Sequence, residues 1–259
     1  MSRDASDGWR IVGAQNGGNI MLLRRELIIF ALSGWVTSAK ASEEDWQALL
    51  SAAVKDQDPL FQGRLIPSPS DPIWAEAEAV LAKAPRNRPY DVARYLSTSI
   101  PSKFQMAWPE PDPRNPTLAN PVIVLFFLAT KLRPLGDKTA WCAAFVNWCL
   151  DRAGVPGTHS ASSQSFRSWG NRVWHVDDGD MPVQARTGDI AVFQSRANPG
   201  HGHVGFFKGI NPSQPHHVDI LGGNQFTSSH LHVIDVKSLR TDAGLKLVEI
   251  RTYPGLRRA

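Results

Sequence analysis

The sequence is poor in cysteine, which excludes a fold built on disulfides. Only Cys142 and Cys149 occur among its 259 residues. On a single helix, two residues seven positions apart point along the same face and stand about 10 Å from each other. That separation is too large for a disulfide bond without a backbone rearrangement. Both cysteines are therefore expected to be free thiols.

Long apolar runs and a secretory start are also missing. The first residues, Met1 to Trp9, lack the basic start and apolar core of a signal peptide. The apolar stretch at residues 27–36 is about half as long as a membrane-spanning helix, and the run at 122–129 is shorter still. We therefore expect no membrane segment and synthesis in the cytoplasm.

Concentrated positive charge is the third feature that the chain lacks. The net charge is +4, but its lysines and arginines are scattered apart from the pair Arg257 and Arg258. Proteins that bind nucleic acid carry basic residues gathered on one face or along one helix. We expect no nucleic-acid partner, and the mild positive charge is compatible with an anionic polymer as ligand.

Residues 139–154 carry the clearest helical pattern of the chain. Its apolar residues recur at intervals of three and four, which places them on one face of a helix. They are Cys142, Phe145, Val146, Cys149 and Ala153. Thr139 or Asp137 is the expected N-cap, and Gly154 followed by Pro156 predicts the end.

Cys142 falls in the first turn of this predicted helix. Unpaired backbone N–H groups and the helix dipole favour a thiolate there, so its pKa is expected to be lowered from about 8.5 towards neutrality. A free cysteine on an apolar helical face is more often a small core residue than a nucleophile. We assign that role to Cys149.

The rest of the chain predicts an α+β fold with a largely antiparallel sheet, because helices come first and strands follow without alternation. Helices are predicted at residues 42–54, 71–84, 121–132 and 160–169. Strands are predicted at 189–193, 203–207, 217–221, 230–235 and 245–252. We expect two domains, a mainly helical region of unknown role at 1–89 and a second domain at 90–259.

Polar residues in two of the predicted strands complete a candidate catalytic set with Cys142. A thiol nucleophile needs an imidazole, and the imidazole needs a polar group that orients it. His203 begins one strand, and Asn224 ends the next beside Gly222 and Gly223. His201 shares a strand face with His203, so spacing does not choose between them.

Four ordered motifs resemble the CHAP amidase and peptidase family and the related NlpC-type cell-wall peptidases. They are Trp141 to Val146, Gly188 to Phe193, Gly202 to Phe206 and Leu221 to Gln225. The resemblance covers roughly residues 90–252 and implies a papain-like core, in which a helix bearing the nucleophile packs on an antiparallel sheet.

The resemblance also implies a role for each candidate residue. Cys142 matches the nucleophile, His203 the base and Asn224 the orienting residue, with Gln225 and Asp219 as substitutes for Asn224. The oxyanion hole would contain the backbone N–H of Cys142 and a second donor that the sequence does not identify. Such donors typically supply about 3 kcal/mol. No cofactor or metal is expected.

By resemblance, the substrate is an amide bond of peptidoglycan, either the lactyl amide or a bond within the stem peptide. Neither a signal nor a wall-binding repeat is recognisable in this sequence. We therefore expect an antibacterial effector or a phage-type lysin that reaches the cell wall or periplasm by a non-classical route. An immunity protein would be the expected partner of an effector.

Two other functions compete with this interpretation. The pairs His201 and His203, His216 and His217, and His230 and His232 could ligate zinc, but no His-Glu-x-x-His motif accompanies them. The second alternative is an inactive cell-wall-binding or structural phage domain of the same fold. The nine tryptophans could then line a glycan groove, although tryptophan mostly serves as a core or interface anchor.

Overall fold

The computed structural model describes residues 66–108, 118–134, 136–137, 139–179, 181–227, 232–254 and 256. All of them belong to one compact unit, residues 41–259. The helix predicted at 42–54, His230 and most of the region predicted at 1–89 lie outside the described residues.

Six strands form one antiparallel sheet in the order β1-β6-β2-β3-β4-β5. They are β1 (Asn171–His175), β2 (Ile190–Ser195), β3 (Gly202–Ile210), β4 (His217–Phe226), β5 (His232–Arg240) and β6 (Leu245–Thr252). The sheet confirms the predicted α+β class. Strand β1 was not predicted because it is short and only Trp174 within it is buried, so it carries no apolar alternation.

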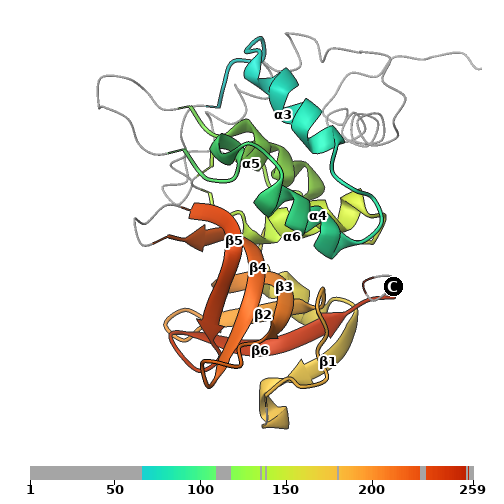
Figure 1. The fold of residues 1–259 in the computed structure, drawn as a ribbon. Helices are drawn as coiled ribbons and strands as arrows, with labels where there is room; N and C mark the ends of the chain where they lie inside the picture. Colours follow the sequence, from blue (N-terminus) through green and yellow to red (C-terminus); the bar gives the residue numbers. More distant parts are fainter. Residues whose placement is uncertain are drawn as a thin grey trace, which may run out of the picture. The chain divides into compact units, whose positions relative to one another are not determined.

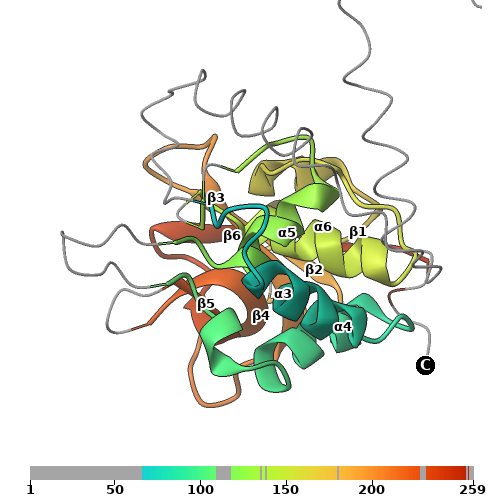
Figure 2. The same cartoon turned by 90° about the horizontal axis from the view of Figure 1, so that it is seen from above.

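The α-helices lie together on one side of the sheet (Figures 1 and 2). The α-helices are α3 (Ile73–Ala82), α4 (Pro89–Thr98), α5 (Pro121–Phe126) and α6 (Cys142–Arg152), and the 3-10 helices are η2 (Ser102–Phe104), η3 (Phe127–Ala129), η4 (Ser163–Ser168) and η5 (Val176–Asp178). The helix predicted at 121–132 is shorter, since α5 passes into η3. The segment predicted at 160–169 is 3-10 helix rather than α-helix.

Helix α6 is the buried centre of this arrangement. Every residue from Cys142 to Arg152 except Asp151 is buried. Its apolar residues share one core with the helices and with one face of the sheet, which contributes Val204, Phe206 and Leu221. A second core covers the other face and includes Phe193 and Ile220. Alternate residues of each strand thus point into different cores.

The predicted N-cap of α6 is wrong. The N-cap position is Trp141, and no side chain caps the helix there. The Asp137 carboxylate instead accepts hydrogen bonds from the backbone N–H groups of Trp108 and Asn120. The Asp137 carboxylate therefore holds the loop before α6 and does not cap the helix. The N–H groups of the first turn stay available to the Cys142 side chain.

Two polar residues of α6 hold neighbouring segments in place. Asn147 donates to the carbonyl oxygens of Ala143 and Ser160 and accepts from the backbone N–H of Thr158. Arg152 donates to the carbonyl oxygens of Ala82 and Ala84 at the end of α3. Helix α3 therefore shares a core with α6, although it lies before the predicted domain boundary at residue 89.

Candidate active site

Cys142 is the first residue of α6, and the start of β3 reaches its sulfur. Its Sγ accepts a hydrogen bond from the backbone N–H of Val204. The N–H groups of Ala143 and of Cys142 itself also point to the sulfur. The peptide that joins His203 to Val204 therefore lies against the thiol. The fold thus brings the backbone next to His203 to the Cys142 sulfur, while the His203 side chain shares a sheet face with its strand partner Phe193.

The expected ionisation of Cys142 is wrong. Burial raises the pKa of the Cys142 thiol, because a thiolate would lose its hydration, and the three backbone N–H groups offset only part of this effect. The side chain is 4% exposed. The effect of burial is larger than that of the helix start, so Cys142 rests as a neutral thiol.

His203 is the second residue of β3 and is 7% exposed. Its strand partner is Phe193, and the two rings lie 6.4 Å apart. A Cβ atom on Gly222 would lie 3.2 Å from the His203 Nε2, so the imidazole occupies the space that glycine leaves open. Within the described residues, this nitrogen is buried without a hydrogen-bond partner.

Burial also controls the charge of His203. It lowers the pKa of the imidazole to about 4, because the protonated ring would lose its hydration. Both the imidazole of His203 and the thiol of Cys142 are therefore neutral at rest. A neutral imidazole is the form that can accept a proton.

The three candidates for the orienting residue occupy different places. Asn224 has a left-handed backbone, with φ of 60°, and its Oδ1 accepts a hydrogen bond from Nδ1 of His232. Asp219 is the third residue of β4, where it accepts a hydrogen bond from Asn211. Neither residue has a hydrogen bond to His203 in the part of the chain that the structure describes.

Gln225 lies beside the space that the His203 imidazole occupies. A Cβ atom added to Gly222 would lie 3.2 Å from the imidazole Nε2 and 3.0 Å from the Gln225 Nε2, so both nitrogens border the same space. The Gln225 amide is fixed there, because it donates to the carbonyl oxygens of Ile220 and Asp235. Of the three candidates, Gln225 is the one that shares this space with the imidazole.

The other histidines are dispersed. His201 is exposed just before β3, and His216 and His217 lie at the start of β4, at the opposite end of that strand from Asn224. Among the described residues, no three histidine, cysteine, aspartate or glutamate side chains gather in a way that could hold a metal ion. The sequence indicates His232 only as half of a possible zinc pair and does not predict its hydrogen bond to Asn224.

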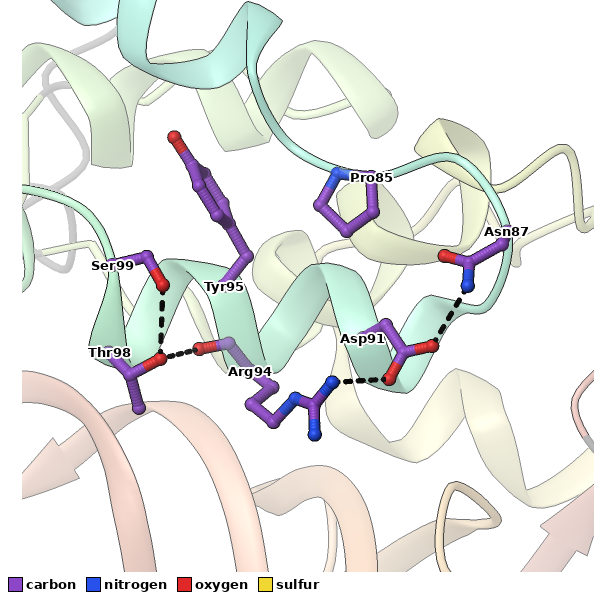
Figure 3. Close-up of a pocket in the computed structure, with 7 residues that line it drawn as sticks. All are labelled: Pro85, Asn87, Asp91, Arg94, Tyr95, Thr98 and Ser99. Atoms are coloured by element: carbon purple, nitrogen blue, oxygen red, sulfur yellow. Dashed lines mark hydrogen bonds and ion pairs between the residues drawn. The ribbon is translucent and has the colours of Figure 1, made fainter.

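A cavity of about 290 Å³ lies along α4 and the loop before it (Figure 3). It is lined by Pro85, Asn87, Asp91, Arg94, Tyr95, Thr98 and Ser99. Asp91 is held there by Asn87, Arg88 and Arg94. None of the candidate catalytic residues lines this cavity.

The fold and the site together define an α+β protein in which a helix begins with a buried cysteine, and the strand that carries His203 donates a backbone hydrogen bond to its sulfur. Residues 135–224 match the family model of the CHAP domain, which confirms the resemblance seen in the sequence. The matched segment contains Cys142, His203 and Asn224 and ends one residue before Gln225. Neither the curated proteins nor the solved structures contain a match to this chain.

CHAP domains are typically cysteine- and histidine-dependent amidohydrolases that act on peptidoglycan. The match therefore indicates a peptidoglycan hydrolase in general terms. No helix within the described ranges is both long and apolar enough to cross a bilayer.

Proposed function

We propose that this protein cleaves an amide bond of peptidoglycan, with Cys142 as nucleophile and His203 as general base, in a papain-like core. The single observation that carries the proposal is the hydrogen bond from the backbone N–H of Val204 to the Cys142 Sγ. It holds the thiol against the residue that follows His203. This backbone contact supports the proposal that the imidazole of His203 reaches the thiol when acyl transfer takes place.

The neutral resting state sets the order of the proton transfers. His203 takes the thiol proton as the sulfur attacks the carbonyl carbon of the amide, and it returns that proton to the leaving amine. Water then hydrolyses the thioester, with His203 again as base. The backbone N–H groups of Cys142 and Ala143 are candidate donors to the oxyanion.

We infer that Gln225, rather than Asn224, positions the imidazole of His203 by packing next to it, since the imidazole Nε2 has no hydrogen-bond partner among the described residues. Gln225 lies beside the space next to Nε2, whereas Asn224 is engaged by His232. With Nε2 directed to the Gly222 side, Nδ1 is the nitrogen left to receive the Cys142 proton. A Gln225→Ala variant should lose turnover, while Asn224→Ala should retain more of it.

The direct test is a digestion of purified sacculi, with mass spectrometry of the soluble products. Wild-type protein should release fragments, and their masses name the bond, either the lactyl amide or a stem-peptide bond. Iodoacetamide should abolish the release and EDTA should leave it intact. Loss of activity in EDTA alone would support the zinc alternative, and binding without release would support the inactive wall-binding alternative.

We further propose that the protein acts on the wall from outside the cytoplasm, as an antibacterial effector or a phage-type lysin. Expression directed to the periplasm should lyse cells, whereas expression in the cytoplasm should be harmless. Lysis that a co-expressed neighbouring protein prevents would identify an immunity protein and favour the effector. Harmless expression in both compartments would contradict this role.

A further inference from the structure

Phe226 is an exposed aromatic residue at the end of β4, three residues after Gly223. It is 58% exposed, although phenylalanine usually contributes its ring to a core. Gly223, three residues earlier, packs so closely on Trp141 and Phe145 that a Cβ atom there would overlap their side chains. Trp141 directly precedes Cys142, so Phe226 extends from a segment that touches the nucleophile helix.

The strand register places Phe226 on the same face of the sheet as α6. Phe226 is paired with His232 across β4 and β5. Ile234, two residues after His232, packs in the core that contains α6. Because residues two apart in a strand share a face, His232 and its partner Phe226 point to that side.

The Phe226 ring is also held in place. The rings of Phe226 and His232 lie 4.3 Å apart, and the His232 imidazole is fixed in turn by its hydrogen bond to Asn224. An exposed aromatic ring that is already ordered loses little conformational entropy when a ligand packs on it. The amide and imidazole beside it supply polar groups at the rim of an apolar surface.

We propose that Phe226, supported by His232 and Asn224, is a substrate-contact residue that packs against a sugar ring of the glycan strand. This inference rests on the proposed function. A pyranose presents a flat face of C–H groups that suits an aromatic ring, and its hydroxyl and acetamido groups suit the adjacent polar side chains. A stem peptide carries mainly small and charged side chains, which match a flat apolar ring less well.

The test compares binding in variants that lack the nucleophile. Peptide-free glycan strands and glycan-free stem peptides are the two probes, and the proteins are Cys142→Ala, Cys142→Ala with Phe226→Ala, and Cys142→Ala with Phe226→Trp. Removal of Phe226 should weaken glycan binding about fivefold or more, and tryptophan should preserve it. Val183→Ala, 73% exposed in the loop before β2, is the control that should change nothing.

Equal glycan binding with and without Phe226 would overturn the proposal, and so would a loss confined to the stem peptide. Thermal unfolding of the variants checks that they fold, and an exposed side chain should change stability by less than about 0.5 kcal/mol. If the hydrolase proposal is wrong, wild-type protein will release no fragments from sacculi. That result does not depend on how Phe226 affects glycan binding.

Discussion

At the scale of single residues, burial decides the chemistry of the site more than sequence position does. The first turn of a helix favours a thiolate, and that argument predicted an ionised Cys142. The structure buries both Cys142 and His203, which raises the pKa of one and lowers that of the other. The sequence identified both residues, but their exposure depends on segments far away in the chain.

The buried imidazole makes stability fall in acid. The pKa of His203 is about 4 in the folded protein and about 6.5 when exposed, so the unfolded chain binds a proton that the folded chain refuses. Stability is therefore lost as the pH falls from 6.5 to 4, by up to about 3 kcal/mol, and levels off below. Denaturant unfolding of wild type and His203→Gln between pH 7 and pH 4 measures this.

The wild-type curve should fall more steeply than that of His203→Gln. The exposed His201→Gln variant is the control and should follow the wild type. Parallel curves for wild type and His203→Gln would show that the imidazole is protonated as readily in the folded state as in the unfolded state.

Gly222 provides the space for the imidazole, so a methyl group there should displace the base. In Gly222→Ala the new Cβ would lie 3.2 Å from the His203 Nε2 and 3.0 Å from the Gln225 Nε2. We expect hydrolysis of sacculi to fall at least about tenfold, because a small misplacement of a catalytic group is costly. Gly209→Ala, on the same sheet with open space around it, should keep its activity. Similar activity in both variants would contradict this geometry.

At the scale of elements, helical spacing predicted α6 and its end at Gly154, which has a left-handed backbone with φ of 70°. Short runs of β-branched and aromatic residues between turn residues predicted five of the six strands, whereas helix α4 was not predicted. The cap of α6 was not predicted, because Asp137 bonds to Trp108 and Asn120, which are distant in sequence. The short strand β1 and the 3-10 helices also have too few apolar repeats to be recognised.

Asn147 joins the middle of α6 to the loop at residues 157–160. It makes hydrogen bonds with Ala143, Thr158, His159 and Ser160 from a buried position. Asn147→Ala should lower the free energy of unfolding by about 2–4 kcal/mol, since four backbone groups would lose the carboxamide of a buried residue as their partner. Urea unfolding measures the change.

Asn211→Ala is the matched control for this variant. Asn211 donates to Asp219 and Ser238 at a largely exposed turn, so its loss should cost less than about 1 kcal/mol. If the two substitutions prove equally mild, the loop is not anchored through Asn147.

At the scale of the whole molecule, the order of helices before strands predicted the α+β class, and the four ordered motifs predicted the match to the CHAP domain. The neighbours of each site residue depend on how strands bend. The β4 and β5 register shifts between Gly222 and Gln225, so the sequence did not predict that Asn224 would contact His232 or that Gln225 would lie beside the imidazole space.

The proposed hydrolysis depends on the Cys142 sulfur, and Cys149 provides a control within the same chain. Cys149 is a second buried cysteine on the same helix, and burial raises the pKa of its thiol as well. The measurement is the rate at which wild type, Cys142→Ala and Cys149→Ala release soluble fragments from purified sacculi. Cys149→Ala should act at close to the wild-type rate, and Cys142→Ala should be slower by about 10³-fold or more. Release by Cys142→Ala at the wild-type rate would contradict the account.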